Sequence, residues 1–183
     1  MIKRPITSVA LVATLLSAPA LAQHSHSHGI GKLGIALDGA VLTLRLDVPL
    51  EDLVGFERAP RDDKERAAVK AAADAIRQAD RMFVPTAAAS CALQGVRLES
   101  PVLDPVLLGG AAGSAKPAAG KSSGHAELAA EIAYQCKEPA ALKSIEVNIF
   151  DSFKKVRRLD VSRIGASGQK ASRVTTKARR VEL

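Results

Sequence analysis

Hydrophobic residues alternate with small or polar residues along much of this chain, which is the pattern of strands that bury one face. The clearest example runs from position 32 to position 49, where two alternating stretches flank Asp38-Gly39. An Asp-Gly pair is typical of a tight turn, so this stretch predicts a β-hairpin. Shorter alternating stretches follow at positions 96–99, 128–136, 145–149, 159–161 and 169–175.

One segment has the period of a helix instead. Val69, Ala72, Ala73, Ile76 and Phe83 recur at helical spacing, and the positions between them are largely charged. Asp62 is placed to cap the first turn while Glu65 reaches back to it, as in a capping box. The predicted fold class is therefore mainly β (α+β): an antiparallel β-sandwich or open sheet of about seven strands with one packed helix.

The start of the chain has the three parts of a secretory signal. Lys3 and Arg4 precede an apolar run at positions 9–16, and Ala20-Leu21-Ala22 forms a small-residue exit. We expect residues 1–22 to be a signal peptide and the product to be periplasmic. Residues 23–31 then form a flexible leader that contains histidines. Residues 32–183 form a single β-rich domain with a mobile loop at 109–124, where Gly, Ala, Ser, Lys and Pro follow no period.

Composition narrows the function classes. The chain has 183 residues, of which 47% are hydrophobic, so it can bury one core and is not disordered throughout. Four Phe, one Tyr and no Trp leave few aromatic faces for stacking bases, and together with the export signal this disfavours a nucleic-acid role. The glycines from Gly29 to Gly34 match a dinucleotide fingerprint in spacing, but they open a hairpin instead of a helix. We find no hydrolase motif and therefore expect a protein that is not an enzyme.

The two cysteines, Cys91 and Cys136, lie in a chain predicted to be exported. Disulfides persist in oxidising compartments, and there is no Cys-x-x-Cys spacing to suggest a metal site. We expect a disulfide between them.

Three of the four histidines alternate near the predicted start of the processed chain, at His24, His26 and His28. Neutral imidazole binds zinc, copper and nickel, and alternate residues of an extended segment can converge on one ion. His125 and Glu127 form a second pair, which would face the same way on a strand. The sequence therefore predicts a site for zinc, with copper or nickel as the second choice. The alternative is a disordered spacer between signal and domain.

The end of the chain is strongly basic. From position 151 to 183 there are 10 Lys or Arg against 3 Asp or Glu, a balance of +7, whereas positions 23–150 hold 14 against 16, a balance of −2. A positive surface attracts anionic lipids or acidic partners. The competing hypothesis is thus an interaction module that docks through this basic face to an envelope or membrane partner. The alternative is a solvated sheet face.

Several blocks of the chain also resemble one known family. They are His26-Ser27-His28-Gly29, Asp38-Gly39, positions 49–57, Pro60, Cys91, Cys136, positions 139–144, Phe150, positions 159–161 and positions 167–169. These blocks resemble the ZrgA-like family of zinc-regulated periplasmic proteins, whose domain carries the label "unknown function". The block from Leu53 to Glu57 is the most specific part. The resemblance implies an accessory to zinc uptake or buffering that works near a metal importer, with histidines as ligands.

The chain departs from that family in two places. Arg58 stands where the family usually has a histidine after its Gly-Phe-Glu block, and the loop at 109–124 lacks the His and Asp residues common there. The resemblance therefore implies that this protein holds fewer ions than its relatives.

Overall fold

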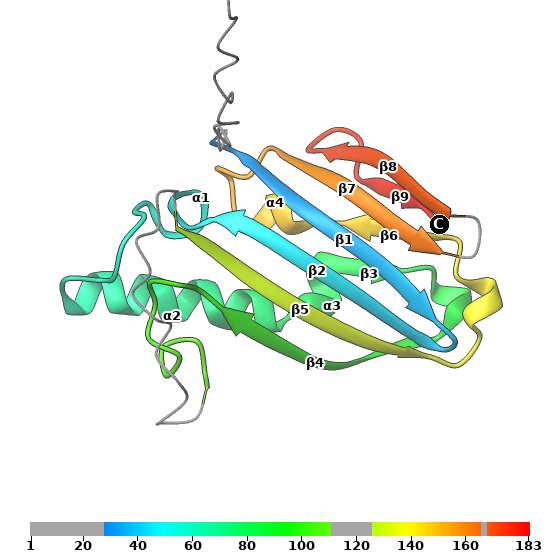
Figure 1. The fold of residues 1–183 in the computed structure, drawn as a ribbon, viewed down its shortest axis with the longest axis horizontal. Coiled ribbons are helices and arrows are strands. Elements are labelled where there is room, and N and C mark those ends of the chain that lie inside the picture. Colours follow the sequence, from blue (N-terminus) through cyan, green and yellow to red (C-terminus); the bar gives the residue numbers. More distant parts are fainter. Residues whose placement is uncertain (1–27, 111–125, 166–167) are drawn as a thin grey trace, which may run out of the picture.

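Strands dominate the computed structural model, which describes residues 28–110, 126–165 and 168–183 (Figure 1). The strands are β1 (Ile30–Asp38), β2 (Val41–Pro49), β3 (Phe83–Pro85), β4 (Cys91–Glu99), β5 (Glu127–Cys136), β6 (Ser144–Val147), β7 (Arg158–Gly165), β8 (Gly168–Thr175) and β9 (Arg180–Glu182). The α-helices are α1 (Leu50–Val54), α2 (Asp63–Arg77), α3 (Ala79–Met82) and α4 (Ile149–Ser152), and short 3₁₀ turns occur at Ala87–Ala89 and Pro139–Ala141. The predicted β-rich α+β class is confirmed.

Six strands form the larger sheet, in the order β4-β5-β2-β1-β7-β8. The predicted hairpin is present as β1 and β2, which pair antiparallel with Lys32 opposite Asp47. All neighbours are antiparallel except β1 and β7, where Ile30 pairs with Arg158 in a parallel register. This sheet is therefore mixed, whereas we expected an antiparallel one, because alternation identifies strands and faces but not the direction of a distant partner.

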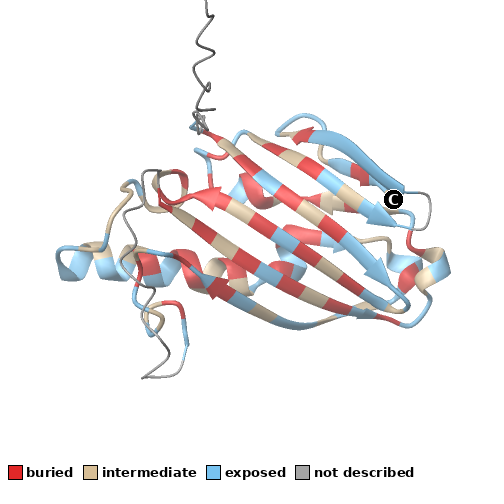
Figure 2. Cartoon of the chain, in the orientation of Figure 1, coloured by how far each residue is buried: buried red, intermediate tan, exposed pale blue. Residues whose placement is uncertain are grey.

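The helices and the three-stranded sheet β3-β6-β9 lie together on one face of the six-stranded sheet (Figure 1). Figure 2 shows the other face, where buried residues alternate with half-buried and exposed ones along β1, β2 and β5. The side chains of Leu42, Leu44 and Leu46 on β2 are fully buried. Both sheets and the helices thus share one hydrophobic core.

Helix α2 packs on the sheet as its pattern predicts. Val69 and Ile76 are among its buried residues, and the carboxylate of Asp62 accepts a hydrogen bond from Glu65 N–H at 2.8 Å. The helix ends at Arg77, so the prediction that Phe83 continues it is wrong. Gln78 leaves the helical conformation, a short α3 follows, and Phe83 is the buried first residue of β3.

Cys91 and Cys136 form the predicted disulfide, which joins β4 to β5. The two residues lie directly opposite each other in the strand register. They stand at the end of β5 that is far from Glu127.

The predicted boundaries fall partly outside the described residues. Strand β1 begins at Ile30, so the last two positions of the predicted leader, 30 and 31, belong to the sheet. The signal segment 1–22 lies outside the described residues, as does the predicted loop beyond Gly110. Within the described residues, no helix has both the length and the apolar character needed to cross a membrane.

Candidate metal centre

Three potential metal ligands meet at the end of the sheet where β1 begins and β2 leads into α1. They are His28, Glu51 and Glu57, and one ligand atom from each lies within 4.8 Å of the others. His28 Nδ1 lies 3.4 Å from Glu51 Oε2. An imidazole and two carboxylates therefore converge on one point at the surface.

The hairpin brings His28 and Glu51 together. In its register Lys32 lies opposite Asp47, and each residue before Lys32 on one strand corresponds to one residue after Asp47 on the other. Continuing the same count by four residues places position 28 opposite position 51. Both residues lie beyond the paired strands and Glu51 belongs to α1, so the hairpin brings the two segments to the same end of the sheet and the turn into α1 completes the approach.

Glu57 reaches the same point because the chain reverses after α1. Gly55 ends this helix with a φ of 90°, and its N–H donates to the carbonyl of Glu51 at 2.9 Å. Glycine adopts this left-handed conformation without the steric penalty of a side chain. The turn carries the chain back past Glu51, so a carboxylate six residues later joins the cluster.

The neighbours of Glu57 anchor the chain on both sides of it. Phe56 packs against the hydrophobic core. The guanidinium of Arg58 lies 5.0 Å from the centre of the Phe56 ring and donates two hydrogen bonds to Glu65, at 2.6 and 2.7 Å. These bonds, and one from Arg61 N–H, lower the pKa of Glu65 to about 2. Arg58 therefore ties this turn to α2.

Gly29 fixes the backbone that follows His28. Its φ is 78°, and a Cβ at this position would lie 2.9 Å from Arg157 Nε and 3.0 Å from the carbonyl of Lys155. Its own carbonyl accepts hydrogen bonds from the N–H groups of Arg157 and Arg158, at 2.9 and 3.0 Å. The position therefore suits glycine for both conformation and space.

The geometry fits a small divalent cation. Zinc binds imidazole nitrogen and carboxylate oxygen at about 2.0–2.2 Å, so two ligands of a tetrahedral ion lie about 3.4 Å apart. His28 and Glu51 already have this separation. Their side chains are 58% and 39% exposed, so an ion can reach them from solvent.

The residues predicted from sequence divide into two groups. His28 belongs to the cluster, and Glu127 lies opposite Pro49 in the β2–β5 register, at the same end of the sheet. His24, His26 and His125 lie outside the described residues. Sequence reasoning missed Glu51 and Glu57 as ligands; the partial signal for them is that Glu51 follows the end of the predicted hairpin, at the same end of the sheet as His28.

The basic segment near the chain end is partly neutralised by its own carboxylates. Asp160 pairs with Arg158 and Arg173, Asp151 pairs with Arg179 and Lys154, and Glu146 pairs with Arg180. At least five of the ten cations in this segment therefore have an acidic partner among the described residues.

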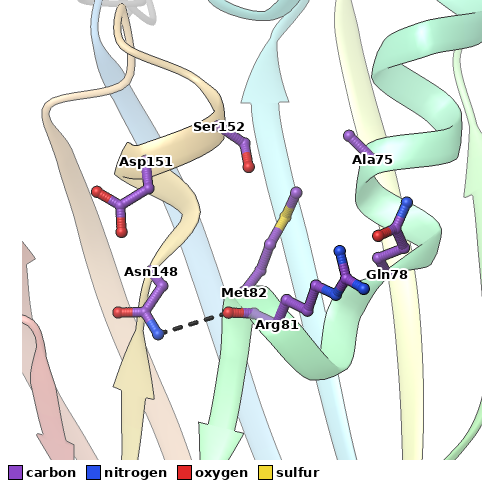
Figure 3. A pocket seen from close by; sticks show the side chains of 7 residues that line it. All are labelled: Ala75, Gln78, Arg81, Met82, Asn148, Asp151 and Ser152. Carbon is purple, nitrogen blue, oxygen red and sulfur yellow. Dashed lines mark hydrogen bonds between the residues drawn. The ribbon is translucent and has the colours of Figure 1, made fainter.

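A hollow of about 370 Å³ occurs elsewhere, between the α2–α3 junction and α4 (Figure 3). It is lined by Ala75, Gln78, Arg81, Met82, Asn148, Asp151 and Ser152. Across it, the side-chain amide of Asn148 donates to the carbonyl of Arg81 at 3.4 Å. None of the three clustered ligands lines this hollow, so it is separate from the candidate metal centre.

One comparison with known proteins identifies a family connected with zinc. No curated protein matches this chain. Residues 25–183 match a family described as "ZrgA family zinc uptake protein". This match includes His28, Glu51 and Glu57 and extends over most of the sequence, so the chain belongs to the ZrgA family of zinc uptake proteins.

Proposed function

We propose that this protein binds zinc as a non-enzymatic accessory to zinc uptake, and that His28, Glu51 and Glu57 form the binding site. The observation that carries the proposal is the convergence of these three ligand atoms within 4.8 Å at an exposed end of the sheet. Membership of a zinc uptake family supports the choice of zinc.

The ligand set suits capture with ready release. Structural zinc sites usually have four protein ligands, whereas three ligands leave a position open for water or for an incoming donor. Two carboxylates and one imidazole also lack the soft sulfur donors that favour Cu(I). His24, His26, His125 and Glu127 are further candidate donors from the sequence. We place the action outside the cytoplasm, which the family and the sequence of residues 1–22 both support.

Titration of the tag-free processed protein with zinc in a calorimeter tests the site. We expect His28→Ala, Glu51→Gln and Glu57→Gln each to weaken binding by about tenfold or more, since even residues that support a zinc ligand contribute about 10- to 100-fold. Glu138→Gln is the matched control, because it removes an exposed carboxylate outside the cluster.

A His24→Ala/His26→Ala variant separates the cluster from the leader. Loss of zinc binding in this variant, together with unchanged binding in the three cluster variants, would place the site in the leader and reject the cluster. Acid should release the ion in either case, because protons compete with zinc for imidazole and carboxylate.

A further inference from the structure

Asp52 is a buried acidic residue that stands directly beside the candidate metal centre. It is 5% exposed, follows Glu51 in α1, and is not a member of the ligand cluster. Burying a carboxylate is costly unless hydrogen bonds compensate for its lost hydration. Its position therefore calls for a specific partner.

That partner is the backbone next to His28. Asp52 Oδ2 accepts a hydrogen bond from Gly29 N–H at 2.7 Å, across 23 residues of sequence. This N–H belongs to the peptide group that joins His28 to Gly29, so the bond fixes one of the two peptide groups that carry the histidine side chain. Hydrogen bonds to an ionised acceptor are short and about twice as strong as neutral ones.

The bond completes a clamp around Gly29. The N–H of Gly29 donates to Asp52, and its carbonyl accepts hydrogen bonds from the N–H groups of Arg157 and Arg158 at the start of β7. Asp52 and Glu51 are neighbours in one short helix, so the same helix presents a candidate ligand and anchors the residue that follows the other one. The backbone on one side of His28 is thereby fixed, and the imidazole it carries lies 3.4 Å from Glu51.

We propose that Asp52 is a positioning residue of the zinc site, which acts on zinc through the orientation of His28. This inference rests on the proposed function. Preorganised ligands bind more tightly because less conformational freedom is lost on binding. Removal of the anchor should lower zinc affinity although Asp52 does not bind the ion itself.

Two conservative variants separate geometry from charge. Asp52→Asn keeps an acceptor at the same place and removes the charge, whereas Asp52→Glu keeps the charge and shifts the acceptor by one methylene. If Asp52 acts by positioning His28, the zinc affinity of Asp52→Asn should stay within about threefold of wild type. Asp52→Glu and Asp52→Ala should bind zinc about tenfold or more weakly, as is found when residues that support a zinc ligand are replaced. Asp63→Asn is the matched control, since the side chain of Asp63 is 98% exposed in another helix.

The same substitutions in a His28→Ala background test the route of the effect. We expect Asp52→Glu to have no further effect there, because the residue that it orients is gone. The inference is overturned if Asp52→Asn weakens binding as much as Asp52→Glu, or if Asp52→Glu weakens binding equally without His28. The proposed function fails differently: His28→Ala and Glu51→Gln would then bind zinc like wild type.

Discussion

The disulfide between Cys91 and Cys136 offers a sharp test of how the sheet is stabilised. The two cysteines are 45 residues apart in the sequence and opposite each other across β4 and β5. In the unfolded chain a link of this span removes loop-closure entropy that corresponds to about 4 kcal/mol at 25 °C. Natural domains have unfolding free energies of about 5–15 kcal/mol, so the Cys91→Ser/Cys136→Ser variant should lose a large fraction of its stability.

Urea unfolding measures this loss. With an m-value of about 2 kcal/mol per molar urea, a loss of 4 kcal/mol lowers the midpoint by about 2 M. Zinc affinity should not change, because Cys136 is nine residues along β5 from Glu127, a distance of about 30 Å at 3.3 Å per residue. Reduced wild-type protein is the control and should unfold with the variant.

Two results would refute this reasoning. A loss below about 1 kcal/mol would mean that the unfolded chain gains little freedom when the link is cut. A weaker zinc affinity in the folded variant would mean that the two ends of β5 are coupled.

Three further predictions concern residues that hold the layers together. Tyr134→Phe removes the hydrogen bond from the hydroxyl to the buried carbonyl of Phe83, at 3.0 Å, and should lower the unfolding free energy by about 1–3 kcal/mol in urea; unchanged stability would contradict this. Ile76→Ala leaves a cavity where α2 packs on the core and should lower the unfolding free energy by about 2–5 kcal/mol. A loss below about 1 kcal/mol would mean that the helix is loosely packed. The pKa of Glu65 is about 2 in the folded protein, below its ordinary value of 4.5, because Arg58 binds its carboxylate. The stability that comes from this lowered pKa is present above pH 4.5 and is lost as the pH falls toward 2. In the Glu65→Gln variant the unfolding free energy should therefore fall less steeply between pH 4.5 and pH 2. The same fall in the variant as in the wild type would contradict this prediction.

The sequence indicates the faces of the hairpin correctly but not its register. Alternation places Leu42 and Leu44 in the core, and both are buried. A two-residue turn at Asp38-Gly39 would pair position 37 with position 40, whereas the structure pairs Asp38 with Val41. A shift of this kind keeps every side chain on its face, so periodicity cannot detect it.

The candidate site was only partly predictable from the sequence. Histidines are rare in this chain and draw attention, whereas Glu51 and Glu57 are two of 19 acidic residues. Only their positions in the folded chain, in α1 and after the turn at Gly55, distinguish them from the rest. The acceptor role of Asp52 is also invisible in the sequence, because it depends on a contact across 23 residues.

The parallel pairing of β1 with β7 has a consequence for how the nascent chain matures. β1 is among the first segments of the domain to be synthesised, yet one of its two neighbours begins only at Arg158. Pairings between segments so distant in sequence form slowly, because the entropy of closing a long loop is lost before any stabilising contact forms. The seam between β1 and β7 therefore stays open until Arg158 and the residues after it have been synthesised, and β1 keeps one unpaired edge until then.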